Sequence, residues 1–360
     1  MAITRPTYAT RNRVKRAADI KLTAHNDQQV DDALEAAADT VEGALHRVFY
    51  TTLTTRRFDW PNFQGTYPWK IYLEANELAD VTGTVPIVTT GGSSPQTIPA
   101  GNLMWGPWNY PAPPYTRLEI DRSTSSTFGV GNTPQQDVHI TGLFGYQDVF
   151  ATAGTLAADV TTTTTTSVQI SNGALVDVGD ILLLGTERML VTDRDMVSTG
   201  QTQQSTGVST ALKNDDLLQV TDGSKFARQE VVQLDGEQML ITSVTGNVLT
   251  VIRAWNGTTL ATHSGATVYA ERLMTVVRGG FGSTAATHTS GDAAQIAVVP
   301  PLVRQYAEAE AIVAVAQQIG AYSQVQGDGQ SKVKQIAAGL PDLRDRAYTA
   351  FGRKARQRTV

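Results

Sequence analysis

Two copies of one stretch decide the fold of this chain: TVIRAWNGTTLATH at residues 250–263 and TVVRGGFGSTAATH at residues 275–288. The second copy lies 25 residues after the first, and the threonine, arginine, glycine and histidine positions match. β-Branched residues followed by glycine are typical of a strand that runs into a turn. We therefore expect both copies to occupy equivalent places in two small β units.

A second repeat precedes this one. Residues 167–192 align without a gap with residues 217–242, at an offset of 50. The order along the chain is therefore first half, first half, second half, second half. This order predicts that one β unit (217–270) is nested in an inter-strand loop of another (167–192 plus 273–296), because loop-closure entropy grows slowly with length. The matched pairs are Gln169 with Gln219, Gly173 with Gly223, Leu184 with Leu234, Glu187 with Glu237, Met189-Leu190 with Met239-Leu240, and Thr192 with Thr242.

Helical periodicity flanks the β region on both sides. Apolar residues recur every three or four positions between 26 and 48, where Asn26 and Gln29 form an N-cap box. The same period returns after Pro300-Pro301 and ends at Gly320, and a last helix is expected to begin near Pro341. The apolar positions are Val30, Leu34, Ala37, Val41, Leu45 and Val48, then Leu302, Tyr306, Ala309, Val313, Ala316 and Ile319, then Leu343, Ala347, Ala350 and Phe351.

Together these patterns predict an α+β fold. Short strands are expected at 69–74, 117–120 and 138–144, with a loop rich in glycine, serine and proline at 91–114. Residues 1–150 and 297–360 would then form a helical core with a short-stranded sheet. Residues 151–296, which begin with a run of threonines, would form an inserted all-β domain made of the two nested units.

Composition excludes several classes of protein. The 360 residues contain no cysteine, which excludes disulfides, thiolate metal sites, iron–sulfur clusters and cysteine nucleophiles. There is no run of roughly 18 apolar residues, and the arginine- and threonine-rich start lacks the apolar core of a signal peptide. Membrane insertion and export are therefore disfavoured.

Basic residues gather at both ends of the chain. Arg5, Arg11, Arg13, Lys15 and Arg16 open it, and Arg344, Arg346, Arg353, Lys354, Arg356 and Arg358 close it. Since the whole chain has a net charge of −5, the body between the ends is strongly acidic. The basic ends are either solvated helix faces and tails or docking segments for an acidic surface or DNA.

The sequence predicts no catalytic, cofactor-binding or metal-binding site. His25, His46, His139, His263 and His288 lack ligand spacing, and the last two match in the repeat, which favours a structural role over a metal or receptor contact. Gly129-Val130-Gly131 and residues 327–332 lack the remainder of nucleotide-binding motifs and are interpreted as turns. Asp31, Asp32, Glu35, Asp39 and Glu42 are interpreted as a solvated helix face. The prediction is that the chain is not an enzyme.

Aromatic residues crowd around the prolines of the first half: Trp60, Tyr67, Trp69, Trp105, Trp108 and Tyr110. Local packing or burial between subunits is the favoured interpretation, because tryptophan and tyrosine are enriched in interfaces. A sugar or peptide platform is the alternative. A glycan hydrolase would need two carboxyl groups facing one cleft, and no spacing indicates that.

Four segments together resemble the head-tail adaptor (connector, head completion) family of siphophages. They are the helix 30–48 that runs into a threonine-rich strand, the stretch VHITGLFGY at 138–146, the helix entered through Pro300-Pro301, and the closing LPDL helix from Leu340 with its basic tail. The similarity covers residues 10–150 and 297–358. The repeated TVxRGxxG element is also similar to segments of phage virion proteins, so the insert is expected to consist of phage-type β modules.

This resemblance implies a structural virion protein at the head-tail junction, assembled in the host cytoplasm. The family forms homo-oligomeric rings, usually dodecamers, that bind below the portal protein, prolong the DNA channel and offer their other face to a stopper or tail-completion protein. Double-stranded DNA would pass through the lumen without sequence-specific contacts, and the acidic body fits a lumen that repels it. The portal-docking residues would be Arg344, Arg346, Phe351, Arg353, Lys354, Arg356 and Arg358.

A second structural role stays open. In a baseplate, fibre or capsid-decoration protein, the β domain would be the binding part and the helices would only bring copies together. The two roles differ in symmetry, because fibres are commonly trimers whereas adaptors form large rings.

Overall fold

The computed structural model describes residues 3–17, 27–60, 67–108, 114–129, 133–204, 208–320 and 328–354. It divides into two compact units, which are treated separately. Unit 1 comprises Met1–Ala44, Phe150–Gly280 and Thr284–Phe351. Unit 2 comprises Leu45–Val149, Phe281–Ser283 and Gly352–Val360. These bounds differ from the predicted division into residues 1–150 plus 297–360 and 151–296.

The predicted fold class is wrong. The chain is mostly β, with 36% strand against 22% helix, and its antiparallel sheets rather than a helical core make up most of its regular secondary structure. The sequence pattern misled because a helix of five turns shows its period clearly, whereas strands of three or four residues carry little periodic signal. Many of the strands here are that short.

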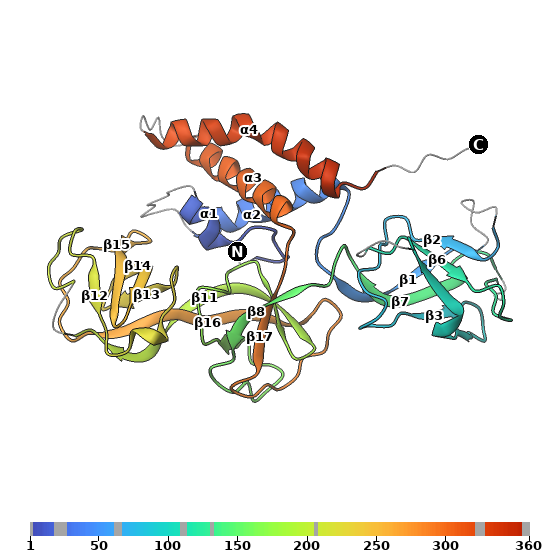
Figure 1. Ribbon diagram of the computed structural model, residues 1–360, viewed down its shortest axis with the longest axis horizontal. Coiled ribbons are helices and arrows are strands. Elements are labelled where there is room, and N and C mark those ends of the chain that lie inside the picture. The colour runs from blue at the N-terminus through green and yellow to red at the C-terminus, as the bar shows by residue number, and fades with distance from the viewer. Residues whose placement is uncertain are drawn as a thin grey trace. The chain divides into compact units, whose positions relative to one another are not determined.

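Unit 1 contains four helices among its described residues and a ten-stranded antiparallel sheet (Figure 1). The sheet order is β12-β15-β14-β13-β16-β11-β10-β17-β8, with β9 paired to β16. The helices are α1 (Arg11–Ala17), α2 (Asp27–Leu45), α3 (Pro301–Gly320) and α4 (Asp328–Phe351). The strands are β8 (Phe150–Thr155), β9 (Ser167–Gln169), β10 (Ile181–Leu184), β11 (Glu187–Thr202), β12 (Leu217–Gln219), β13 (Val231–Leu234), β14 (Glu237–Thr245), β15 (Val248–Trp255), β16 (Thr267–Gly280) and β17 (Ala293–Ala297), and a short 3-10 helix, η2, covers Gly223–Lys225.

The sheet holds two hydrophobic cores of equivalent composition. One, which we call module one, is formed between residues 153 and 296 and includes Leu184 and Met189. The other, module two, is formed between residues 208 and 270 and includes Leu234 and Met239, which are the matched residues of the repeat. The long strands β11 and β16 pair with each other from one module to the other, with register shifts along the way. Each module therefore has its own core, and a two-stranded ribbon connects them.

The helices of unit 1 lie on one side of this sheet (Figure 1). On α2 the buried residues Val30, Leu34, Ala37, Val41 and Leu45 belong to the predicted stripe, but its last member, Val48, lies beyond the end of the helix and is exposed. On α3 the described buried residues are Val303, Tyr306, Ala307, Ala311, Ile312 and Val315, so among the predicted stripe residues with a described side chain only Tyr306 is buried. The sequence of α3 is apolar on several faces, and packing rather than period selects the buried one.

The last helix begins earlier than predicted. It starts at Asp328, and Pro341, the expected first residue, lies inside it. Proline has a φ angle that suits a helix and sacrifices one backbone hydrogen bond, which is tolerated best where the helix faces solvent, as Pro341 does. The expected N-cap Asn26 and Gly327 lie outside the described residues, but the turn predicted over 327–332 is wrong, because residues 328–332 belong to α4.

Unit 2 consists of two small antiparallel sheets around one core. The first has the order β1-β7-β3-β4 and the second β2-β6-β5. The core joins both sheets through Ile71, Leu118, Val138 and Ile140. The strands are β1 (Thr52–Phe58), β2 (Lys70–Tyr72), β3 (Ile87–Thr90), β4 (Thr97–Ile98), β5 (Leu103–Gly106), β6 (Arg117–Ile120) and β7 (Val138–Phe144), with a 3-10 turn, η1, at Ala100–Asn102. The bounds of β6 and β7 agree with the prediction.

Candidate functional site

The predicted docking residues on α4 are accessible. The side chains of Arg344 and Arg346 are 53% and 61% exposed. Each lies near an exposed aspartate of the same helix, Arg344 at 3.3 Å from Asp345 and Arg346 at 2.9 Å from Asp342. Surface ion pairs of this kind are worth less than about 1 kcal/mol, so both guanidinium groups can exchange these partners for others.

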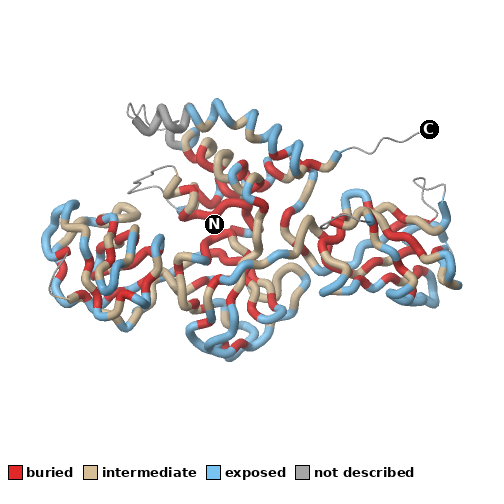
Figure 2. The backbone as a smooth tube through the Cα atoms, viewed as in Figure 1, coloured by how far each residue is buried: buried red, intermediate tan, exposed pale blue. Residues whose placement is uncertain are grey.

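Helix α4 presents most of its surface to solvent (Figure 2). Among its described side chains, which begin at position 335, Ala347 alone is buried. Tyr348 is exposed, and Phe351 is partly buried. The helix packs on α3 with its apolar side and leaves the arginine-bearing side open. A helix attached along one narrow stripe has a large surface for contacts with another molecule.

Arg353 has a different environment, in unit 2. Its backbone N–H donates to the carbonyl of Leu45 at 2.9 Å, and its Nη2 donates to the carbonyl of Ala75 at 3.2 Å. Its Nε lies 3.6 Å from the buried carboxylate of Glu77, which also pairs with Arg47 at 3.0 Å. The charge of Arg353 is therefore used within the chain.

The predicted docking set is divided between the two units. Arg344, Arg346 and Phe351 belong to unit 1, whereas Arg353 and the exposed Lys354 belong to unit 2. Arg356 and Arg358 lie outside the described residues. Of the predicted set, the α4 arginines are the described side chains whose geometry suits a docking surface.

The basic start of the chain is bound to the chain's own acids. Arg5 pairs with Asp39 and Glu42 of α2, and Arg11 donates to Asp31 at 2.6 and 2.8 Å. The expected solvated acidic face of α2 is therefore covered only in part: Asp31 is buried under Arg11, whereas Asp32 and Asp39 are exposed. The remaining links on this face and nearby are Thr4 to Glu35, Tyr8 to Glu42, Lys15 to Asp27 and Arg13 to Glu308.

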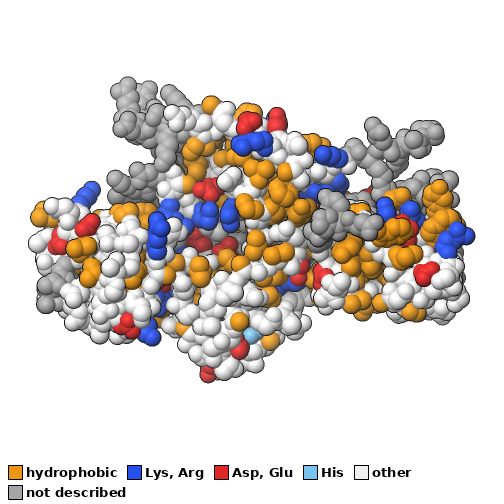
Figure 3. Space-filling view, viewed as in Figure 1, with side chains coloured by type: hydrophobic (Ala, Val, Ile, Leu, Met, Phe, Trp, Pro, Cys, Tyr) orange, Lys and Arg blue, Asp and Glu red, His pale blue; other side chains and the backbone are white. Residues whose placement is uncertain are grey.

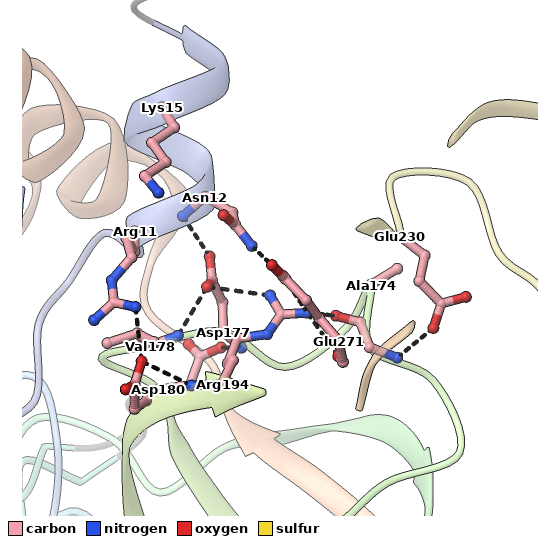
Figure 4. A network of polar contacts seen from close by, with 12 residues as sticks. Arg11, Asn12, Lys15, Ala174, Asp177, Val178, Asp180, Arg194, Glu230 and Glu271 are labelled. Carbon is pink, nitrogen blue, oxygen red and sulfur yellow. Dashed lines mark hydrogen bonds and ion pairs between the residues drawn. The ribbon is translucent and has the colours of Figure 1, made fainter. Parts of the chain in front are cut away.

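A polar network joins α1 to both modules (Figure 4). Asp177 accepts the backbone N–H of Asn12 at 2.8 Å, at the start of α1, and also pairs with Arg194 at 3.3 Å. Arg194 in turn donates to the carbonyls of Gly173 at 2.6 Å and Glu271 at 2.9 Å. Arg194 and its acceptors thus link α1 to loop 173–180, β11 and β16.

The pKa values of two carboxyl groups in this network are shifted in opposite directions. Burial alone would raise the pKa of Asp177, but the charge of Arg194 and several hydrogen bonds hold it below its ordinary value. Burial and the neighbouring charge of Asp177 raise the pKa of Asp180 to about 7. The Asp180 carboxyl accepts the N–H of Asp177 at 2.9 Å, and Glu230 takes the equivalent role in module two by accepting the N–H of Ala227 at 3.2 Å.

Each module also contains a buried glutamate bound by arginine and histidine. In module two, the Glu237 carboxylate accepts hydrogen bonds from Arg253 at 2.8 and 2.7 Å, from His263 at 3.0 Å, and from the backbone N–H groups of Ala254 and Ala261. In module one, the Glu187 carboxylate accepts hydrogen bonds from Arg278 at 2.7 and 2.8 Å, from His288 at 2.8 Å, and from the backbone N–H groups of Gly279 and Ala286. Burial would raise the pKa of each glutamate, but these donors lower it to about 2. The matched histidines therefore close the turn onto a carboxylate.

The threonine run that opens the β region serves the same cluster. Arg278 donates to the carbonyls of Thr162 and Thr165, as Arg253 does to those of Thr210 and Asp215. The sequence repeat shows that Glu187 matches Glu237 and that Arg253 matches Arg278. It gives no sign that Glu187 binds Arg278 or that Glu237 binds Arg253. That pairing required knowledge of which strands are adjacent.

The aromatic residues of unit 2 divide into core and surface. Trp60 is buried against Phe128, with ring centroids 5.1 Å apart. Tyr67 and Trp108 are 49% and 50% exposed, while Trp69 and Trp105 pack partly against the core. Tyr110 lies outside the described residues. Local packing therefore accounts for only some of the group.

The remaining candidate residues provide no further centre. Within the described ranges, no three histidine, aspartate or glutamate side chains are grouped so as to hold a metal ion. His46 lies after α2 and His139 on β7, while His25, Val130, Gly131 and Gly327 are not described. In the described part of the chain, no helix is long and apolar enough to cross a membrane.

Comparisons with protein-family models, with curated proteins and with solved structures found no match for this chain.

Proposed function

We propose that this chain is a structural protein of a tailed-phage particle that forms a homo-oligomeric ring at the head-tail junction. The ring docks on the portal protein, prolongs the DNA channel, and joins the head to a stopper or tail-completion protein. The DNA passes through without sequence-specific binding. The chain acts by assembly rather than as an enzyme.

The observation that carries this proposal is the exposed side of α4. A helix of 24 residues with one buried position among its described side chains gains little from burial within its own chain. Helices in proteins owe most of their stability to packing. Arg344 and Tyr348, one turn apart, lie on one exposed face of α4, and Arg346 lies on nearly the opposite face, so both faces are suited to contacts made on assembly, because arginine and tyrosine are enriched in interfaces.

The place of the β modules also supports the proposal. β8 pairs with β17 so that Phe150 lies opposite Ala297, which means that the two ends of this segment are on neighbouring strands. A segment with adjacent ends can be inserted in a loop without moving apart the two residues that flank the insertion point. The segments that resemble adaptors lie before and after this insert, and α2, α3 and α4 all belong to unit 1.

The docking surface proposed here is narrower than the sequence alone indicated. It consists of Arg344, which shares a face of α4 with Phe351, and of Arg346 on nearly the opposite face of the same helix. Arg353 serves instead to hold the segment 352–354 on unit 2 through Leu45, Ala75 and Glu77. Its substitution is therefore expected to disturb folding as well as docking.

The test is mass photometry and negative-stain microscopy of the full chain with and without the portal protein. We expect rings alone, and portal-bound rings when the portal protein is added. The double variant Arg344→Glu, Arg346→Glu should still form rings but lose at least tenfold in affinity for the portal, because exposed cations act through partner contacts.

Arg228→Glu is the matched control, because Arg228 is an exposed arginine of module two. It should leave both ring formation and portal capture unchanged. Trimers that ignore the portal would contradict the proposal. So would a loss of capture in the control equal to that in the α4 variant.

One observation favours the alternative of a baseplate, fibre or decoration protein. Most of the ordered structure is β, and the largest sheet is built from a duplicated module. In that role the modules would bind the target and the helices would form a trimer. The oligomer size measured in the same experiment distinguishes the two functions.

A further inference from the structure

An open hollow lies on the surface of unit 2, lined by Met104, Trp105 and Trp108. Met104 is exposed and Trp108 is half exposed, whereas Trp105 packs partly against the core and fixes the floor. Figure 3 shows apolar and basic side chains next to each other on the part of unit 2 that holds β2 and β6. The hollow offers an apolar side chain a place to leave water.

Arg117 lies beside this hollow and is held in a fixed position. Its guanidinium carbon is 5.3 Å from the centre of the Trp108 ring, and its Nε is 3.0 Å from the buried carboxylate of Glu119. Gly106 leaves room for it, because a Cβ at position 106 would come within 2.5 Å of the Arg117 Nε. The absence of a side chain at Gly106 therefore allows Arg117 to lie flat across β5.

The outer edge of this guanidinium has no partner in the described part of the chain. The contact with Glu119 involves Nε, which itself has no hydrogen bond of acceptable geometry, and the two terminal nitrogens donate to no described residue. A planar guanidinium stacked on an indole presents a rigid pair of donors that matches a carboxylate. Lys70, whose Nζ lies 3.1 Å from the same Glu119, adds a second positive charge.

The chemistry of the hollow favours a protein over a sugar. A neutral pyranose could stack its C–H face on an indole, but it would offer Arg117 and Lys70 no counter-charge, whereas hydrogen bonds between ionised groups are the stronger ones. A leucine-sized side chain loses no hydrogen bonds there. A carboxylate one or two residues along the same backbone would then reach Arg117, and two cations, Arg117 and Lys70, against the one carboxylate of Glu119 make the surface complementary to an acidic segment.

We propose that this surface, formed by Met104, Trp105, Trp108 and Arg117, binds an acidic segment of a partner protein. An apolar side chain of the partner fills the hollow, and a neighbouring carboxylate pairs with Arg117. Tryptophan and arginine are the residues that most often dominate the energy of such interfaces. This inference does not rest on the head-tail function and applies equally to either role proposed for the chain.

The experiment uses the full chain labelled with 5-fluorotryptophan and ¹⁹F NMR. The sequence has five tryptophans, and Trp108→Phe identifies the resonance of Trp108. The probe is the blocked peptide acetyl-Glu-Leu-Glu-Leu-Glu-amide, and the comparison peptide has lysine in place of glutamate. We expect the acidic peptide to shift the Trp108 resonance with a Kd of about 1 mM, typical of a contact worth about 4 kcal/mol, and the basic peptide to leave it unchanged.

Three variants sharpen the test. Arg117→Gln and Arg117→Lys should both weaken binding about tenfold, since neither keeps the forked donor pair. Lys213→Gln, which removes an exposed cation in module two, should leave binding unchanged. If an Arg117 variant fails to fold, the unmodified chain still decides the matter, because raising NaCl to about 0.5 M should weaken its binding of the acidic peptide severalfold.

Several outcomes would overturn the proposal. One is the absence of a Trp108 shift at peptide concentrations up to about 10 mM, which is ten times the expected Kd. Equal shifts with the acidic and basic peptides are another. A third is a shift produced by a glucuronate disaccharide at concentrations where the acidic peptide has no effect, which would assign the site to acidic glycans instead.

Discussion

Glu187 and Glu237 are the residues on which the two modules depend most. Each is fully buried and receives five hydrogen bonds from an arginine, a histidine and two backbone N–H groups. A buried ion pair is costly to break because the remaining charge keeps its desolvation penalty. These carboxylates therefore hold together strand, turn and loop at one point.

Glu237→Gln should destabilise module two by about 3 to 5 kcal/mol, because it leaves Arg253 buried without its counter-charge. The measurement is hydrogen exchange of the amides of β14 and β15, which reports module two separately from the remainder of unit 1. Asp195→Asn, at an exposed position of β11, serves as the control and should change exchange by less than about 0.5 kcal/mol.

The same glutamates should set the acid sensitivity of the chain. Their pKa of about 2 lies below the ordinary 4.5, so the stability that they confer is present above pH 4.5 and is lost as the pH falls towards 2. In Glu237→Gln that part of the acid dependence of module two should be absent. An acid profile of module two identical to that of the unmodified chain would contradict the assignment.

The pH dependence of stability that Asp180 contributes should have the opposite sign. Its pKa of about 7 lies above the ordinary 3.8, so the folded chain favours its neutral form and loses stability as the pH rises from about 4 to 7. Asp180→Asn keeps a neutral acceptor for the N–H of Asp177 and should remove that loss, about 2 kcal/mol for a partly exposed group. Urea unfolding at pH 5 and pH 8 measures it. Equal pH dependence in both proteins would exclude this role.

At the scale of the elements, close backbone contacts explain why the repeat keeps its glycines. A Cβ at Gly223 would lie 2.0 Å from the carbonyl oxygen of Gly246, and one at Gly173 would lie 2.2 Å from that of Glu271. Both glycines stand at the same position of their modules, where the loop after a short strand passes close to other backbone: the turn between β14 and β15 at Gly223, and β16 at Gly173. No side chain fits there without moving the backbone.

Gly223→Ala should therefore destabilise module two by about 3 kcal/mol, a magnitude reached when a well-packed site is overfilled. Gly236→Ala is the matched control, since a Cβ there meets nothing within 4 Å. Thermal unfolding followed by near-ultraviolet circular dichroism should show a lower transition for the first variant only. Similar melting of both variants would show that the close contact is not limiting.

Whether the buried face of a helix could be predicted depended on how its apolar residues are distributed around the helix axis. The stripe of α2 could be read because charged residues occupy its other faces. The buried side of α3 could not, because its alanines and valines surround the helix and only the neighbouring elements select one face. The acidic face of α2 was interpreted as solvated because the covering segment, residues 3–17, contacts it only in the folded chain.

At the scale of the whole molecule, module two should be dispensable for the remainder of unit 1. Its core lies between residues 208 and 270, and the chain enters and leaves it where Thr202 pairs with Thr267. Replacing residues 203–266 with Asn-Gly should close the ribbon as a tight hairpin.

The shortened chain should keep the oligomeric state of the full chain in mass photometry and the helical content in circular dichroism. Loss of the contacts of Glu230 with Arg272 and Gly173 should cost part of the stability of module one. A monomer that remains folded would show that module two takes part in assembly, contrary to this expectation.

The sequence by itself determined the features that depend on local order: the internal repeat with its matched glycines and glutamates, the bounds of β6 and β7, the stripe of α2, and the absence of cysteine chemistry. Each follows from residues close together in the chain or from copies of one pattern.

Only the tertiary structure decided the balance of strand over helix, the buried side of α3, and the partners of the charged residues. Glu187 meets Arg278, and Arg11 meets Asp193, through contacts between residues far apart in the sequence. Short strands become recognisable only when they are paired, and a cation's partner is fixed by whichever carboxylate the fold brings near it.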